Sequence, residues 1–129
     1  MNGKRLLDTN AVVALFRKEN EIQQLLAGAA EVFVPVTVVG ELYYGAEHSG
    51  RPAENEKQVT AFANANSILA CDLLTARIYA QIKQSLRQKG KPIPENDIWI
   101  AAIALQHGLM LVSKDQHFSH VDNLVTETW

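Results

Sequence analysis

The chain has 129 residues, of which 47% are hydrophobic and 20% are charged, and its formal net charge at pH 7 is −2. This length is enough for one domain with a hydrophobic core, so we expect a single domain spanning residues 1–129. The slightly acidic balance gives no overall positive field for nucleic acid, although local basic patches can still act alone. The single cysteine, Cys71, excludes an internal disulfide framework and is typical of a cytoplasmic protein.

The sequence also argues against a membrane location. Asp8 lies inside the first apolar stretch, which makes the N-terminus a poor signal peptide. The longest apolar run, residues 98–112, is interrupted by the letters QHG and is too short to cross a bilayer. We therefore expect a cytoplasmic protein with no membrane-spanning segment.

Short apolar runs alternate with helical patterns through the first half of the chain. In chain order they predict a strand at 5–7, helices at 11–19 and 19–28, a strand at 31–36, and helices at 38–49 and 54–66. Asp8, Thr9 and Asn10 are alternative N-caps for the first helix, and Thr37 is expected to cap the helix at 38–49.

The second half continues the same alternation. It predicts a strand at 67–72, a helix at 73–90, a loop at 91–96, a helix from 98 to 106, and strands at 109–113 and 123–129. Asp72 is expected to cap the long helix and Gly90 to end it. The helix after Asp97 reads IWIAAIALQ and is apolar on every side, so we expect it to be buried, with Trp99 in the core. Alternating strands and helices predict a three-layer α/β/α domain with a mostly parallel central sheet.

Four acidic residues fall at corresponding places in this pattern. Asp8 and Asp115 directly follow predicted strands, Glu41 lies one helical turn after a strand, and Asp97 opens the buried helix. Functional residues of parallel sheets lie at the carboxyl ends of the strands, which are only about 4.8 Å apart. Carboxylates gathered there repel one another unless they share a cation, and oxygen ligands suit Mg²⁺ or Mn²⁺. A metal and the helix N-terminus would together compensate the charge of Asp97.

Each acid also has an ordinary structural interpretation when it is taken alone. Asp8 can be a helix cap, Asp97 a first-turn acid, Glu41 a solvated side chain and Asp115 a turn residue. Their joint placement at one edge of the sheet favours the metal site.

Other polar residues are assigned less specific roles. His117 and His120 are expected to be structural or solvated, because zinc sites use richer sets of nitrogen and sulfur ligands. The basic residues of the long helix and its end can be a solvated face or a rim that contacts phosphates, and Lys114 is similarly placed beside Asp115. Of the neighbouring tyrosines Tyr43 and Tyr44, we expect one in the core and one at the surface.

Four segments in order resemble the PIN-domain nucleases and, within them, the VapC-like toxin ribonucleases. These segments are LLDTNAVVALF, VPVTVVGELYYGA, KGKPIPENDIWIAAIALQHGLMLVSKDQHF and NLVTETW. The resemblance covers nearly the whole chain and implies a PIN-like three-layer fold. Ser113 stands where threonine is more usual in the family, and Asn123 stands where glycine is common.

The resemblance implies roles for individual residues. Asp8, Glu41, Asp97 and Asp115 match the catalytic acids. Asp8 and Asp97 would contact the metal directly; Asp115 belongs to the same metal-binding set, and the positions of Glu41 and Asp115 often act through water. Thr9, Asn10 and Ser113 match residues that line the pocket. One or two Mg²⁺ or Mn²⁺ ions are implied as cofactors.

The activity implied by the resemblance is metal-dependent endoribonuclease activity in the toxin of a type II (VapBC-like) toxin–antitoxin pair. The implied partners are RNA, a small VapB-like antitoxin and a second copy of the chain in a homodimer. The helices around residues 41–49 and 54–66 are the candidates for the protein contacts. Two alternatives remain open: a PIN-domain RNA-processing nuclease outside any toxin system, and a catalytically weak PIN-like binding domain.

Overall fold

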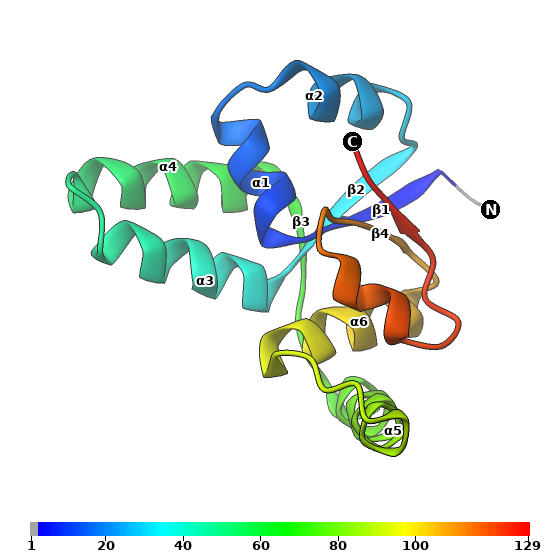
Figure 1. Ribbon diagram of the computed structural model, residues 1–129. Helices are drawn as coiled ribbons and strands as arrows, with labels where there is room; N and C mark the ends of the chain where they lie inside the picture. The colour runs from blue at the N-terminus through cyan, green and yellow to red at the C-terminus, as the bar shows by residue number, and fades with distance from the viewer. Residues whose placement is uncertain (1–2) are drawn as a thin grey trace.

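The computed structural model describes residues 3–129 and contains one five-stranded sheet with helices on both faces (Figure 1). The strands are β1 (Lys4–Leu7), β2 (Glu31–Pro35), β3 (Ser67–Leu69), β4 (Met110–Val112) and β5 (Thr126–Glu127). Their order across the sheet is β3-β2-β1-β4-β5, and each of the four pairings is parallel. The predicted α/β fold with a parallel central sheet is confirmed.

The helices divide between the two faces of the sheet. They are α1 (Thr9–Phe16), α2 (Asn20–Ala27), α3 (Val36–Glu47), α4 (Pro52–Ala65), α5 (Leu73–Lys89) and α6 (Glu95–His107), with a short 3₁₀ helix η1 (Gln116–His120). In Figure 1, α1 and α2 lie on one side of the sheet and α6, backed by α5, lies on the other. Helices α3 and α4 pack against each other and project away from the sheet.

The strand order creates a point of reversal between β1 and β4. From β1 the chain moves outward to β2 and β3, and it then crosses back to β4 and continues to β5. The connections that leave β1 and β4 therefore diverge to opposite faces, which opens a crevice at the carboxyl ends of these two strands. Ligands of parallel α/β sheets bind in this kind of crevice.

Helix α6 forms the centre of the core, as its apolar sequence predicts. Its buried residues are Ile98, Ile100, Ala101, Ala102, Ile103 and Ala104. The three alanines carry small side chains, and the helix packs against the interior strand β4. The expectation for Trp99 is wrong: this side chain is only half-buried and stacks on the ring of Tyr79, with ring centroids 4.1 Å apart. A planar indole at a helix surface finds a stacking partner on α5 instead of a place in the core.

Three of the helix starts test the predicted caps. Asp8 is the N-cap of α1, and its Oδ1 accepts a hydrogen bond from the Thr9 N–H at 2.8 Å. The prediction that Thr37 caps α3 is wrong, because α3 begins at Val36 directly after Pro35. Pro35 is the last residue of β2 and α3 follows it directly, so Thr37 lies inside the first turn, where its buried hydroxyl has no hydrogen-bond partner. Asp72 caps α5, and Gly90 ends it in the left-handed conformation, both as predicted.

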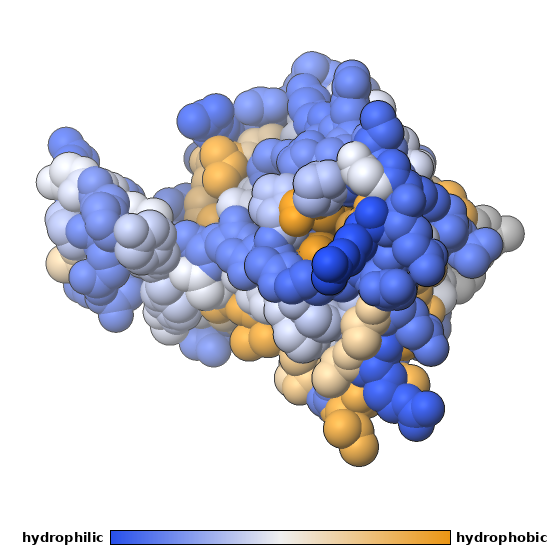
Figure 2. Space-filling view, turned by 60° about the horizontal axis from the view of Figure 1, so that its bottom comes forward, coloured by the Kyte–Doolittle hydropathy of each residue, from blue (hydrophilic) through white to orange (hydrophobic). Residues whose placement is uncertain are grey.

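The remaining differences are at segment boundaries. Helix α1 ends at Phe16, before the predicted residue 19, and the backbone at Lys18 has a positive φ of 57° that is incompatible with a continuing helix. The 3₁₀ helix η1 was not expected, and only Thr126–Glu127 of the last predicted strand pairs with β4. Within residues 3–129, no helix has the length and apolar character to cross a membrane. Figure 2 shows a mostly hydrophilic face with separate, small hydrophobic patches.

Candidate active site

Asp8 is fixed at the carboxyl end of β1 by two hydrogen bonds. Asp8 is only 5% exposed. Oδ1 accepts from the Thr9 N–H, and Oδ2 accepts from the Ser113 hydroxyl at 2.6 Å. Because β1 and β4 are neighbours in the sheet, the residue that follows β4 can reach the residue that follows β1. Asp8 is therefore held in one orientation at the crevice.

Ser113 joins this carboxylate to the next acid along the chain. Its hydroxyl donates to Asp8 and accepts from the Asp115 N–H at 3.0 Å. Asp115 in turn caps η1, with Oδ1 accepting from the His117 N–H at 3.3 Å. The sharp turn after β4 thus points Asp115 and His117 back over the end of the sheet.

Asp97 enters the same place from the first turn of α6. The Nε2 atom of His117 lies 2.5 Å from Asp97 Oδ2 and 2.8 Å from Asp115 Oδ2. Within the described residues, ligand atoms of Asp97, Asp115 and His117 all lie within 4.8 Å of one another, a spacing that suits a metal ion. The metal-binding residues predicted from the sequence were Asp8, Asp97 and Asp115, without His117. Asp8 lies nearby at the carboxyl end of β1, and His117, which the sequence assigned only a structural or solvated role, lies against two of the predicted acids.

Glu41 completes the acidic lining from α3. The Thr9 hydroxyl donates to Glu41 Oε2 at 2.8 Å, which links the starts of α1 and α3. One pocket of about 500 Å³ is lined by Asp8, Thr9, Asn10, Val13, Ala14, Arg17, Glu19, Glu41, Asp97, Lys114, Asp115 and Trp129. It gathers all four predicted acids and two of the three predicted pocket residues. The third, Ser113, is buried behind Asp8 and supports it.

The surroundings of Asp8 and Asp97 disfavour the ionised form of these two acids. Burial raises the pKa of Asp8 above its usual value, and the charge of Asp115 raises it further, against the lowering effect of the Ser113 hydrogen bond. Burial also raises the pKa of Asp97, with Asp8 and Asp115 adding to the effect and the hydrogen bond from His117 opposing it. A cation among these groups would reverse the shifts, because it favours the charged carboxylates.

The donor set fits a hard divalent ion. Carboxylate oxygens are the ligands that Mg²⁺ and Mn²⁺ prefer, and an imidazole nitrogen is compatible with Mn²⁺. The three acidic side chains come from different segments of the fold, and Asp8 is already oriented by its neighbours. Asp8, Asp97, Asp115 and His117 are therefore the residues that could hold a metal.

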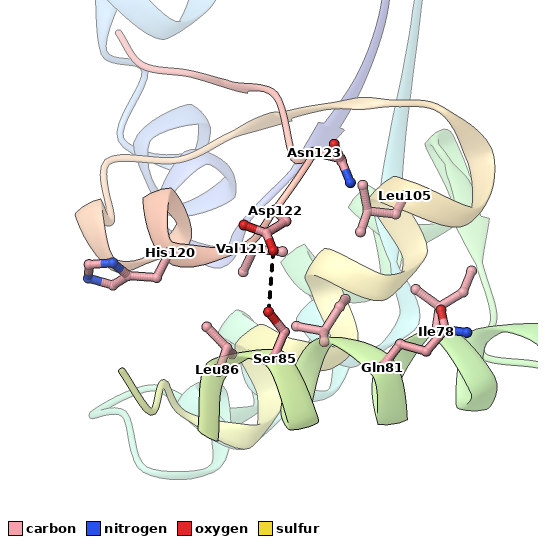
Figure 3. Close-up of a pocket in the computed structure, with 10 residues that line it drawn as sticks. Ile78, Gln81, Ser85, Leu86, Leu105, His120, Val121, Asp122 and Asn123 are labelled. Carbon is pink, nitrogen blue, oxygen red and sulfur yellow. Dashed lines mark hydrogen bonds between the residues drawn. The ribbon is translucent and has the colours of Figure 1, made fainter. Parts of the chain in front are cut away.

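A second hollow lies away from the acids, between α5 and the segment after η1 (Figure 3). Ser85 and Asp122 face each other across it, with the hydroxyl donating to Asp122 Oδ2 at 3.3 Å. The neighbouring Lys89 pairs with Asp122 Oδ1 at 2.5 Å. The acid in this hollow is paired with a lysine, whereas within residues 3–129 the acids of the first pocket form no ion pair with a lysine or arginine.

Fold and site together define an α/β protein with an acidic pocket at the reversal point of a parallel sheet. The model of the PIN domain family matches residues 5–124, and the chain belongs to this family.

Individual relatives share the full extent of the chain. The chain is 37% identical over 129 residues to Ribonuclease VapC2 of Haemophilus influenzae, covering 98% of both proteins. It is 29% identical to the tRNA(fMet)-specific endonuclease VapC of Shigella flexneri, again over 98% of both. Among solved structures, DNA-bound VapBC from Salmonella typhimurium contains a chain that superposes with a TM-score of 0.89 at 29% identity, covering 100% of this chain and 99% of that one. VapBC2 from Rickettsia felis bound to promoter DNA gives a TM-score of 0.88 at 27% identity, over 98% of both chains.

Proposed function

We propose that this chain is a metal-dependent endoribonuclease and the toxin of a type II toxin–antitoxin pair. The observation that carries the proposal is the convergence of Asp8, Glu41, Asp97 and Asp115 on one pocket at the reversal point of the sheet. The names of the full-length relatives, ribonuclease and tRNA endonuclease VapC, support the choice of RNA as substrate. We also propose that residues 1–129 act as one domain and work in the cytoplasm.

Asp8, Asp97 and Asp115 would hold Mg²⁺ or Mn²⁺, and His117 is placed to add a nitrogen ligand. A bound divalent ion would lower the pKa of a water molecule and stabilise negative charge on the phosphate oxygens. Ser113 and the Thr9 N–H keep the Asp8 carboxylate in a fixed orientation, so this ligand needs little rearrangement on binding. The raised pKa values of Asp8 and Asp97 are consistent with acids that require such a cation.

Glu41, the remaining acid, can orient the attacking water or accept its proton. Glu41 accepts one hydrogen bond from Thr9 on Oε2, which leaves capacity on the carboxylate to orient a water molecule or accept its proton. In the reaction the water oxygen forms a bond to phosphorus, and the bond from phosphorus to the 3′ oxygen breaks. No covalent bond between enzyme and substrate is needed.

The proposed partners are an antitoxin, a second copy of the chain and RNA. The solved relatives are VapBC complexes, which supports a small antitoxin. Helices α3 and α4 project from the sheet and present exposed surface, including the 68% exposed Tyr44, so we propose them as the contact elements for the dimer and the antitoxin.

The proposal is tested by incubating the purified chain with total cellular RNA. Samples contain Mg²⁺ or Mn²⁺, or a chelator, and the Asp97→Asn variant runs in parallel. We expect discrete cleavage that disappears with the chelator and in the variant, and the fragment ends identify the substrate. Equal behaviour of the two proteins, whether both are inert or both active, contradicts the proposal and favours a PIN-like binding domain.

A further inference from the structure

Two cations and one aromatic ring line the acidic pocket but take no part in its acid cluster. Lys114 lies between Ser113 and Asp115, Arg17 follows the end of α1, and Trp129 is the last residue of the sequence. All three contribute to the same pocket as the four acids. The pocket therefore combines a group of acids with a basic and aromatic rim.

Neither cation is neutralised by the acids beside it. Across residues 3–129, the ion pairs formed by lysine and arginine side chains engage Lys4, Arg5, Arg51, Lys83 and Lys89. Lys114 instead places Nζ 4.9 Å from the centre of the Trp129 ring. An ammonium group in this position is attracted by the π-electrons of the indole, and because no carboxylate holds it, it can move from the ring to a phosphate and leave that ring face to a base. Its backbone is also restrained, because the Lys114 N–H donates to Asn10 Oδ1 at 3.4 Å.

The Trp129 ring is set in a defined position. It is half-buried and packs against the hydrophobic core, and its Nε1 atom is buried without a hydrogen-bond partner. The backbone that carries it is anchored to the end of β4, because the Ser113 N–H donates to the Glu127 carbonyl at 3.0 Å. The indole therefore forms part of the pocket wall.

We propose that Lys114, Arg17 and Trp129 form a nucleotide-positioning rim, in which Trp129 stacks on a base next to the cleaved phosphate and the two cations contact flanking phosphates. This inference rests on the proposed ribonuclease function. A pocket with four carboxylates repels a phosphate backbone, so a polynucleotide needs cations at its edge to approach. Every base has a π-face, and stacking on an aromatic side chain holds single strands without depending on one sequence.

The test measures binding of single-stranded RNA of about ten nucleotides to the full chain carrying Asp97→Asn, which separates binding from cleavage. Tryptophan fluorescence reports stacking, and affinities are measured at several salt concentrations with Mg²⁺ present. In this background we compare Trp129→Leu, Trp129→Phe, Lys114→Gln and, as a matched control, Arg77→Gln on the exposed surface of α5. Thermal melting of each variant checks that the fold is retained.

We expect Trp129→Leu to weaken binding about tenfold or more and to remove most of the fluorescence change, while Trp129→Phe recovers much of the affinity. Lys114→Gln should lower the slope of log affinity against log salt by about 0.7, the value for one phosphate contact on a single strand. Trp129→Leu should leave that slope unchanged, because stacking releases no counterions. Arg77→Gln should change neither quantity.

The rim is contradicted if folded Trp129→Leu and Lys114→Gln bind RNA like their parent, or if RNA leaves the fluorescence of Trp129 unchanged. In cleavage by the otherwise unmodified enzyme, the rim predicts that Trp129→Leu raises KM more than it lowers kcat. If Trp129→Leu and Lys114→Gln both cleave RNA with unaltered KM, the proposed function stands and the rim is contradicted. A chain that does not cleave but binds RNA through Trp129 loses the function and retains the rim.

Discussion

Two acids in the first turn of α6 have opposite environments, although only one residue separates them. Glu95 accepts hydrogen bonds from Lys83 Nζ at 2.7 Å and from the Tyr79 hydroxyl at 2.6 Å, and these contacts lower its pKa. Asp97 faces the pocket, where burial and the charges of Asp8 and Asp115 raise its pKa despite the contact with His117.

The same contrast holds for the acids near η1 and β1. Asp122 pairs with Lys89 on the outer side of η1, which lowers its pKa, while burial raises the pKa of Asp8 at the end of β1. Glu95 and Asp122, the two acids beside α5, each pair with a lysine of that helix. In the pocket the nearby cations Lys114 and Arg17 form no such pair, which supports the proposal that these acids take a cation from solution. Substituting Asp97 in the pocket and Glu95 beside α5 therefore separates the roles of the two regions.

Loss of one pocket carboxylate should have the largest effect. Asp97→Asn removes a proposed metal ligand, so we expect kcat/KM for RNA cleavage to fall by a factor of about 100 or more. Glu95→Gln, two residues away, should stay within about twofold of the wild type, because an exposed ion pair contributes little. Initial rates on a defined RNA measure both. Similar losses in the two variants would contradict the division between the regions.

The support of Asp8 should matter next. Ser113→Ala removes the hydroxyl that donates to Asp8 Oδ2, so the pKa of Asp8 should rise further and its carboxylate should lose its fixed orientation. We expect affinity for Mn²⁺ to fall roughly 10- to 100-fold, the usual effect of losing a group that orients a metal ligand. Ser85→Ala removes the corresponding hydroxyl beside Asp122 and serves as the control. Calorimetric titration gives the affinities, and equal values for the two variants would argue against this role of Ser113.

A smaller effect is expected on the stability of the metal-free protein. Asp97→Asn removes a charge that burial and two neighbouring acids destabilise, so the free energy of unfolding at pH 7 should rise slightly. Glu95→Gln should leave stability unchanged or slightly lower. Urea denaturation in chelator measures both variants. Added Mg²⁺ should reverse the order of wild type and Asp97→Asn, because only the wild type keeps the complete site.

The smallest expected effect is the change with pH in the stability difference between wild type and Asp97→Asn. The pKa of Asp97 is raised in the folded state, so the folded chain holds the proton more tightly than the unfolded chain. Its ionisation therefore reduces stability as pH rises through this raised pKa, and the cost disappears as pH falls below the ordinary aspartate range. The advantage of Asp97→Asn should be largest at neutral pH and shrink on acidification. For Glu95, whose pKa is lowered, ionisation adds stability that is lost only as pH falls through its lowered pKa. An advantage of Asp97→Asn that grew on acidification would contradict these signs.

Much of the fold and most of the acid cluster could be predicted from local patterns. Asp8 and Asp115 directly follow β1 and β4, and α6 carries a continuous apolar sequence, so their relative positions are determined by parallel-sheet topology. His117 could not be placed in this way, because η1 is a single short turn without hydrophobic periodicity. Its one available signal is its position two residues after Asp115, which the tight turn brings back over the pocket.

Other features depend on contacts between distant segments. Trp129 meets Lys114 only because β5 pairs with β4, and the two-residue strand β5 is too short for its boundaries to be predicted. The wrong cap at Thr37 has a local cause, because β2 runs directly into α3 at Pro35 and the helix starts before the polar side chain suggests. Sequence patterns therefore predict the residues placed at strand ends, whereas contacts between distant side chains require the structure.

The most direct test is a titration of Mn²⁺ into the metal-free chain, followed by electron paramagnetic resonance, which counts bound ions without any need for a substrate. Wild type, Asp97→Asn and Glu95→Gln are compared at neutral pH. We expect saturable binding of one or two ions to wild type and Glu95→Gln, and a large loss of affinity in Asp97→Asn. Equal binding by wild type and Asp97→Asn would show that the pocket acids do not form the cation site.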